Sequence, residues 1–494
     1  MQNGSERGIK HIELDRKQLR WETLDVEQLI GEDHAARIIW ELSGKLDLSR
    51  FESESKTTEG QAGRPCWCAQ LLVSVWVYSY SLGIASARAI ERMMSYEPGL
   101  RWLAACERIN HHSLSDFRMG HQEALQQLFA QFLALLEEAG LVDLNTLLQD
   151  GTKVRAVASS GSLHRRSTLE KRMAKAQQVV QQLDEQADSE AAEERRRAAQ
   201  RRAAREALER AQAALQALQQ LEAQSAPSKR PDVRVSISEA EARKMRHGDG
   251  GVSPSYNVQV TTEGQSRMIV AIGLSTHAED TQELLPAMER AEQNSGRKPA
   301  TVIADNGYAT RANVEQTSER DIYLIAPWKE DGSREAGACA RNGIEPEFAP
   351  SQFRVQGDGQ RLICPAGIPL VVIQQKVHHG VRKDVFEASA AACASCPMRS
   401  PCCGPRPGPR RIERTVESDA MRTYLERMQW PQTQNLYKKR SEFAEFPHMW
   451  MKAVARFRRF SVRGVVKAGI EALWVALAYN ISQWMRLRCP VVAA

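Results

Sequence analysis

The sequence predicts a mixed α/β protein in which a layered α/β domain is combined with an all-helical region and a coiled-coil hairpin. Residues 63–141 carry apolar side chains at three- and four-residue spacings throughout. Residues 256–305 run through strand, strand, helix and strand patterns, and residues 167–224 contain two heptad-like runs. Together these three patterns favour helices packed beside a sheet, with a helical hairpin attached.

The composition is that of a folded protein with several domains. The 494 residues are enough for two to four domains, and 42% hydrophobic with 26% charged residues is ordinary. The first residues lack the apolar run of a secretory signal. The longest apolar stretch, residues 71–85, is interrupted by serines and shorter than the ~20 residues that span a bilayer. We therefore expect a cytoplasmic protein without a membrane partner.

The N-terminal part divides into two segments by pattern. Residues 1–62 form a polar segment of mixed character. Residues 63–143 are expected to form a helical domain, since QLLVSVWVYSYSLGI and EALQQLFAQFLALLEEAGL have helical periodicity and Gly140 supplies a stop. Asn110 or Ser113 is a suitable cap for a helix between the two runs.

The layered α/β core is expected in two pieces, residues 144–160 and 232–310. The first contains TLLQDGTKVRAVAS, in which Thr152, Val154 and Val157 suit a strand. The second contains YNVQVTTEGQSRMIVAIGLS, two strand-like runs, followed by the helix-like DTQELLPAMERAEQNSG and the short apolar run ATVIAD. This order predicts a sheet with at least one covering helix.

Three further segments complete the chain. Residues 161–231 are predicted to form a coiled-coil hairpin insertion of two antiparallel helices, with one long helix as the alternative. Residues 311–435 are rich in Cys, Pro and Gly, and we expect an irregular insertion there. Residues 436–488 are expected to be mostly helical.

Two aspartates belong to strand-like runs of the expected core, Asp150 inside the first run and Asp305 at the end of a later one. Asp150 lies within QDGTK and Asp305 lies at the end of ATVIAD. Because side chains at strand ends face the ligand crevice of α/β sheets, the two carboxylates could share a divalent cation. Each motif alone also fits an ordinary Asp-Gly or Asp-Asn-Gly turn, which is the better interpretation of either one in isolation.

The C-terminal segment adds a third carboxylate among cations. On one continuous helix Tyr437, Arg440, Glu445 and Lys452 fall within an arc of about 140°. A carboxylate next to cations and a phenol suits a metal ligand beside a bound phosphate. An exposed helix with salt bridges is the alternative, and Glu442 is a rival for Glu445.

The same segment is strongly basic. Residues 437–463 contain eight Lys or Arg against two Glu, interleaved with aromatic side chains. This excess fits a surface that contacts phosphates, with a solvated helix face as the alternative.

The cysteines are clustered, and the chain lacks the secretory signal that would favour a disulfide framework. Five of the ten lie between Cys364 and Cys403. Cys364, the pair Cys393-x2-Cys396 and Cys402 could supply four thiolates to a structural Zn²⁺, and Cys403 could replace Cys402. Reduced cysteines in an irregular loop are the alternative, because the single CxxC lacks a second CxxC partner.

A set of motifs resembles bacterial insertion-sequence transposases. QDGTKVRA, YNVQV, TVIADNGY and the Tyr-x2-Arg-x4-Glu-x6-Lys pattern before RFRRFSVRG occur in the order found in that family. The likeness is to the insertion-sequence four/five superfamily and, within it, the eleven-eighty-two branch. SARAIERM, LRWLA and HHSLSDFR are similar to the N-terminal domain of that branch, so the resemblance runs from about residue 60 to 487.

The resemblance implies a ribonuclease-H-like catalytic domain of the Asp-Asp-Glu (DDE) type. Carried over residue by residue, Asp150, Asp305 and Glu445 would be the catalytic metal ligands for Mg²⁺ or Mn²⁺. Tyr437, Arg440 and Lys452 match the family's Tyr-Arg-Glu-Lys signature. Four residues separate Arg440 from Glu445, whereas the better-known spacing is three, and this departure keeps Glu442 as the rival. Lys153, Arg456 and Arg459 are expected to make further phosphate contacts.

The resemblance also implies a function. Two Mg²⁺ ions ~4 Å apart would activate a water and stabilise the leaving 3′-oxygen, and the freed 3′-hydroxyl would attack target DNA. The expected partners are double-stranded DNA, as transposon ends and target, and a second copy of the chain on that DNA. The expected location is the bacterial cytoplasm at the nucleoid. A DNA-binding protein without catalysis and a nuclease without strand transfer are the alternative functions.

Overall fold

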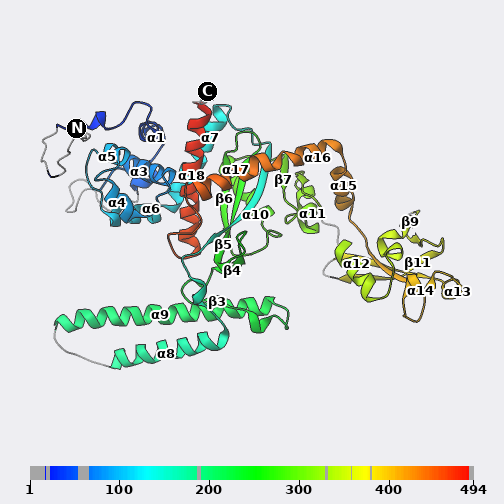
Figure 1. Ribbon diagram of the computed structural model, residues 1–494. Coiled ribbons are helices and arrows are strands. Elements are labelled where there is room, and N and C mark those ends of the chain that lie inside the picture. Colours follow the sequence, from blue (N-terminus) through cyan, green and yellow to red (C-terminus); the bar gives the residue numbers. More distant parts are fainter. Residues whose placement is uncertain are drawn as a thin grey trace, which may run out of the picture.

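A six-stranded mixed sheet lies at the centre of the computed structural model (Figure 1). The structure describes residues 17, 23–53, 66–185, 191–328, 332–357, 359–378 and 381–488. The main path of the sheet is β4-β5-β1-β7-β8, and β6 pairs with β5. The strand bounds are β1 Thr146–Arg155, β4 Arg243–Arg246, β5 Val252–Glu263, β6 Ile269–Ser275, β7 Thr301–Ala304 and β8 Tyr323–Ile325.

Strand direction changes at the middle of this sheet. β1 is antiparallel to β5 and parallel to β7, and β8 continues parallel to β7. β5 and β6 form a hairpin, as the paired Val- and Ile-rich runs predict. The mixed α/β fold expected from the sequence is confirmed.

Helices cover the sheet and continue its core into the N-terminal region. α10 (Leu284–Ser295) and α18 (Val465–Arg488) pack against β6, and α7 (Gln122–Glu138) packs against both helices. The N-terminal helices are α1 Ala35–Gly44, α2 Ser49–Ser53, α3 Ala69–Ser81, α4 Ala87–Met93, α5 Pro98–Leu103 and α6 His111–Gly120. One hydrophobic cluster joins these helices to α18 and the sheet.

The helical N-terminal region is confirmed, but it begins earlier than the polar character of residues 1–62 suggests. Ile39 and Phe51, from α1 and α2, are buried in the same core as α3. Their apolar residues are sparse between charged ones, so the segment reads as polar although one face of each helix is buried. Residues 1–16, 18–22 and 54–62 of that call lie outside the described residues.

A buried polar contact ties the helical region to the C-terminal helix. Arg118 of α6 donates to the backbone oxygen of Ala85 at 2.7 Å and lies 3.9 Å from the buried carboxylate of Glu471 in α18. Trp474 of α18 donates its indole N–H to the Arg118 carbonyl at 3.2 Å. The N-terminal helical region and α18 are therefore joined through a buried ion pair.

α18 is the one described helix that is long and apolar enough to cross a membrane by length and composition. Of its apolar window, 72% is buried inside the protein. Asn480 uses its side-chain amide to bond both the N–H and the carbonyl of Ile269 at the edge of the sheet. These contacts are those of a core helix.

Two long helices project from the sheet domain, as the heptad runs predict (Figure 1). α8 (Arg166–Glu185) and α9 (Ala191–Gln224) lie antiparallel, because Arg166 pairs with Glu222 at one end and Arg205 with Asp184 towards the other. Leu169, Leu215 and Leu218 are among the buried residues between them.

The expectation of an irregular segment at 311–435 is wrong. It contains α11 Arg311–Glu319, α12 Gly332–Arg341, α13 Ala390–Ala394, α14 Arg399–Cys403, α15 Asp419–Met428 and a second sheet. That sheet has the order β13-β12-β11-β10-β9. Its bounds are β9 Arg354–Gln356, β10 Arg361–Ile363, β11 Pro369–His378, β12 Val381–Ala388 and β13 Arg411–Thr415. The strands were missed because two are three residues long and β11 exposes Val371, Ile373 and Val377.

The expected continuous helix from Tyr437 is interrupted. α16 (Pro431–Lys438) ends at a turn on Lys439, and α17 (Arg440–Ala453) begins directly after it. The turn is closed by the Lys439 N–H bonding the Leu436 carbonyl at 3.2 Å, a three-residue contact that ends the regular helical ladder. Tyr437 therefore lies on a different helix from Arg440, Glu445 and Lys452.

Candidate active site

Two predicted carboxylates lie side by side where the parallel pairing of β1 with β7 ends. Gln149 of β1 is paired with Ala304 of β7; Asp150 is the next residue of β1, and Asp305 is the residue after β7. Strand alternation then places Asp150 on the same face as Leu148, whose neighbour in the core is Ile303. The segments before both aspartates are buried, and the buried amide of Gln149 is satisfied by hydrogen bonds with Gln259 and Thr261.

α17 crosses this face and brings its charged residues to Asp150. Ala444 is buried against Leu148 and Ile303, which fixes the helix on the sheet. One turn to either side of Ala444, Arg440 Nη2 lies 3.1 Å from Asp150 Oδ1 and His448 Nε2 lies 3.5 Å from Asp150 Oδ2. The i, i+4 spacing of helix residues therefore places a guanidinium and an imidazole on the two oxygens of one carboxylate.

The electrostatics of the site are those of crowded, partly desolvated carboxylates. Burial raises the pKa of Asp150, the Arg440 charge opposes this, and Asp280 and Glu445 raise it further. Burial also raises the pKa of Asp305, with the Asp150 charge adding to the effect. Neighbouring carboxylates repel each other, and either a proton or a bound divalent cation relieves that repulsion.

The neighbouring bases are also affected by burial. Burial lowers the pKa of His448 to about 3, and the charges of Lys452 and Arg440 act in the same direction. Both ring nitrogens of His448 are buried without a hydrogen-bond partner. Burial lowers the pKa of Lys452, which the Asp150 charge partly restores. His448 is thus a neutral imidazole in contact with Asp150.

The structure bears on the choice between Glu445 and Glu442. Both side chains are exposed on α17. The Glu445 charge raises the pKa of Asp150, so Glu445 lies close enough to act on that carboxylate. Glu445 therefore stays the predicted third carboxylate, with Glu442 as its rival.

The remaining predicted phosphate contacts are spread around this centre. Tyr437 packs beside Ala444 in the small core under α17. Lys153 lies on β1, and Arg456 follows α17 with a positive φ of 53°. The segment with Arg459 runs beside β1, because the Phe460 N–H bonds the Arg155 carbonyl at 2.9 Å. Lys452 lies near this centre, because the Asp150 charge raises the pKa of its ammonium group.

Asp280, which no sequence motif marks as a site residue, lies behind the site. Its Oδ1 accepts hydrogen bonds from Asn257 Nδ2 and Gln259 Nε2 of β5, each at 2.7 Å. A Cβ on Gly151 would lie 2.6 Å from the same oxygen, so Asp280 approaches β1 where the strand has no side chain. Strand alternation puts this contact on the face opposite Asp150. In the sequence Asp280 has the appearance of a helix start. Its contacts with Asn257 and Gln259 could not be predicted, because those residues are more than twenty positions away.

A buried amide network continues from Asp280 under both strand ends. Gln259 accepts a hydrogen bond from Gln149 at 2.7 Å and one from the Tyr308 hydroxyl at 2.5 Å. Thr261 donates to Gln149 at 2.7 Å. This network holds β1, β5 and the segment after Asp305 in one arrangement.

The predicted cysteines lie apart from the carboxylates, beside the second sheet. Across the residues that the structure describes, no three His, Cys, Asp or Glu side chains form a group that could already hold a metal ion. The donor chemistry of the first site nevertheless suits Mg²⁺ or Mn²⁺, since Asp150, Asp305 and Glu445 offer hard carboxylate oxygens.

Two segments of the chain match transposase family models. Residues 24–119 match a family model described as a transposase domain. Residues 363–485, which include Glu445 but not Asp150 or Asp305, match a family model described as a transposase DDE domain. No curated protein matches the chain. In these two segments the chain is similar to transposases, and the matches support an insertion-sequence transposase of the DDE type.

Proposed function

We propose that the chain binds the terminal inverted repeats of its element, cleaves the DNA there and transfers the strands to a target by a cut-and-paste route. The observation that carries the proposal is the position of Asp150 beside Asp305, directly after the last parallel pair of β1 and β7, under a helix that supplies Glu445 and Arg440. We assign Asp150, Asp305 and Glu445 as ligands of Mg²⁺ or Mn²⁺. The mixed sheet, antiparallel on one side of β1 and parallel on the other, supports a ribonuclease-H-like domain.

The protein residues then have separate roles. Bound Mg²⁺ ions supply activation of a water or 3′-hydroxyl nucleophile and stabilisation of the leaving oxygen. Arg440 holds the Asp150 carboxylate from one side in the free protein and is placed to contact a phosphate when DNA is bound. Lys452 adds a second positive charge near Asp150 and offsets charge that develops on the phosphate.

The DNA surface is proposed to run from this site along the basic segment after α17. Arg456, Arg458 and Arg459 are exposed there, beside the end of β1. Cations so arranged neutralise backbone phosphates without reading sequence. The helical region that matches the transposase domain would read the element ends, and two copies of the chain on DNA would bring the ends together. The proposed setting is the bacterial cytoplasm at the nucleoid.

Cleavage of a labelled DNA end of the parent element, with Mg²⁺, tests the proposal. The wild type is compared with Glu445→Gln and with Glu442→Gln, a matched change on the same helix. We expect metal-dependent nicking by the wild type and Glu442→Gln, loss of nicking in Glu445→Gln, and similar DNA binding by all three in a gel shift.

The other outcomes separate the competing functions. Nicking that is lost in Glu442→Gln but kept in Glu445→Gln would reassign the third ligand. Nicked ends that never join a target plasmid would indicate a nuclease without strand transfer. DNA binding without nicking by the wild type would indicate a DNA-binding protein that lacks catalysis.

A further inference from the structure

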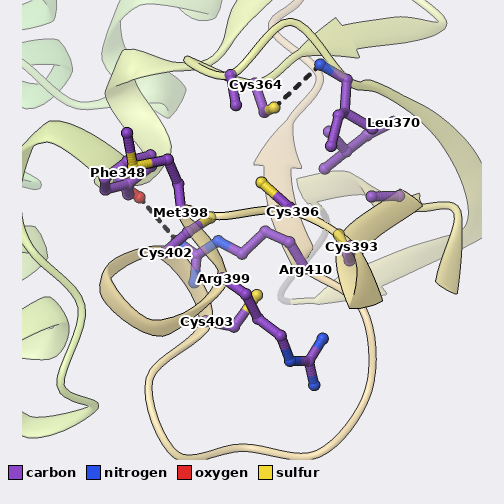
Figure 2. Close-up of a pocket in the computed structure, with 13 residues that line it drawn as sticks. Phe348, Cys364, Leu370, Cys393, Cys396, Met398, Arg399, Cys402, Cys403 and Arg410 are labelled. Atoms are coloured by element: carbon purple, nitrogen blue, oxygen red, sulfur yellow. Dashed lines mark hydrogen bonds between the residues drawn. The ribbon is translucent and has the colours of Figure 1, made fainter. Parts of the chain in front are cut away.

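Five cysteines from three separate segments line one cavity beside the second sheet (Figure 2). Cys364 follows β10, Cys393 lies in α13, Cys396 lies in the turn after it, and Cys402 and Cys403 end α14. The cavity is small, with a volume of about 20 Å³, and its other lining residues are mainly apolar, including Phe348 and Leu370, with Arg399 and Arg410 beside them. None of the five is joined in a disulfide.

The backbone around Cys364 is arranged to present its sulfur. The Gly367 N–H donates to the Cys364 carbonyl at 2.8 Å, and the Ile368 N–H donates to Cys364 Sγ at 3.1 Å. Gly367 has a φ of +83°, a conformation that side chains disfavour, so this turn needs glycine. A backbone N–H aimed at sulfur stabilises negative charge on it, as metal-bound thiolates require.

Cys393 and Cys396 have the spacing of a zinc-ligand pair on a local turn. The Cys396 N–H bonds the Cys393 carbonyl at 3.4 Å, and the Arg399 N–H bonds the Cys396 carbonyl at 3.1 Å. These contacts close the chain around the pair, and both residues line the cavity from one side. Cys402 reaches it from the next helix, within a C-x2-C-x5-C arrangement.

The region around the cavity has little other means of stabilisation. Its own hydrophobic cluster is small, with Phe348, Phe353, Leu362, Leu370 and Phe386 as its large members. The opposite face of β11 is exposed at Val371, Ile373 and Val377. Small units with one thin core commonly depend on disulfides or a metal.

We propose that Cys364, Cys393, Cys396 and Cys402 bind one structural Zn²⁺, which fastens α13 and α14 to the β10–β11 turn. In the described residues no three of these sulfurs already form a metal group, so binding draws them towards the centre of the cavity. Zn–S bonds of about 2.3 Å bring tetrahedral sulfurs to about 3.8 Å from one another. Cys403, adjacent to Cys402, remains a thiol. The site is independent of the carboxylates proposed for catalysis.

Metal analysis of the purified full-length chain tests this site directly. We expect one zinc per chain in the wild type, and less than about 0.2 in the double variant Cys393→Ser/Cys396→Ser and in Cys402→Ser. Two controls should keep one zinc: Cys403→Ser, a neighbour in the same cavity, and Cys106→Ser in an exposed turn of the helical region. Asp150→Asn should also keep it, which separates this metal from the catalytic one.

Cobalt substitution gives a second measurement that does not depend on activity. The Co²⁺ protein should show sulfur-to-cobalt charge-transfer absorption, which Cys403→Ser retains and Cys402→Ser weakens. Less than one zinc per several wild-type chains would overturn the proposal, as would iron and sulfide in its place. Zinc that survives in Cys402→Ser but is lost in Cys403→Ser would overturn the choice of the fourth ligand.

Discussion

The two sheets of this protein are stabilised in different ways. The six-stranded sheet shares one continuous core with the N-terminal helices and α18. The five-stranded sheet has its own small core and lies beyond α15, at the far end of the molecule from α18 (Figure 1). The first sheet is covered by a large hydrophobic core, whereas the second has an exposed apolar face and a cavity lined by cysteine side chains.

The candidate sites follow the same division. Around Asp150, side chains from β1, the β6–α10 connection, β7 and α17 are brought together by a core that already holds those elements. Around the cysteines, the proposed metal would itself hold α13 and α14 against the β10–β11 turn. A change at the first site should therefore alter chemistry and leave the fold, while a change at the second should alter the fold locally and leave the chemistry of the carboxylates.

The largest effect is expected at Asp150. Asp150→Asn keeps the size of the side chain and removes the charge that Arg440 contacts at 3.1 Å. Cleavage of a labelled element end should fall by more than about 10³-fold, beyond the 10²–10³ typical of losing one electrostatic stabiliser. Circular dichroism and the melting temperature should stay close to the wild type. A variant that is equally inactive because it is unfolded would contradict the division drawn between the two sheets.

The second-largest effect is expected at Arg118, which joins α6 to α18 through its buried contact with Glu471. Arg118→Leu leaves the carboxylate of Glu471, which has no exposed side-chain surface, without its cation. Loss of one partner of a buried pair costs about 3–5 kcal/mol in the free energy of unfolding, to be measured by denaturant titration.

A matched control for that change is an exposed pair in the same body. Arg320 bonds Glu289 at 2.9 Å with both side chains well exposed. Arg320→Leu should cost at most about 1 kcal/mol. Equal effects of the two substitutions would show that the Arg118 contact does not join the helical region to α18.

A chelator should lower the stability of the five-stranded sheet and leave that of the six-stranded sheet unchanged. Removal of zinc by a strong chelator is expected to speed limited proteolysis within residues 344–415 by about 100-fold, equivalent to ~3 kcal/mol of local stability. Fragments from the six-stranded sheet should appear at an unchanged rate. Equal protection with and without chelator would mean that the small core suffices on its own.

The sequence predicted what depends on local pattern. The strand before Asp305 is a short apolar run closed by a carboxylate, the run around Asp150 is strand-like on both sides of it, and the C-x2-C pair is a local spacing. None of these signals needs knowledge of distant neighbours, so the elements and their order along the chain could be read directly.

What could not be read depends on contacts between distant segments or on weak local preference. The break at Lys439 divides a run that is helical on both sides, so a projection onto one helix put Tyr437 with Glu445. His448 read as an unremarkable helix residue, and only the packing of Ala444 shows that it meets Asp150. In the second sheet, β12 and β13 carry polar residues on both faces and β11 carries apolar residues on both faces, so alternation did not reveal these strands.

The smallest effect is expected at Asp280, which positions the site from behind. Asp280→Asn keeps the shape and an amide oxygen that can accept both hydrogen bonds from Asn257 and Gln259, but it removes the negative charge that acts on Asp150 and Asp305. Changes to such supporting groups typically cost about 10–100-fold in activity or metal affinity. Gly151→Ala should act in the same range, because its Cβ would lie 2.6 Å from the Asp280 oxygen. Cleavage rates across a Mg²⁺ titration, with Mn²⁺ binding followed by electron paramagnetic resonance, should show weaker metal binding in both variants. If Asp280→Asn matched the complete loss expected for Asp150→Asn, Asp280 would instead be a direct ligand. If neither variant differed from the wild type, the network under β1 would serve only the fold, and positioning of Asp150 would rest on α17 alone.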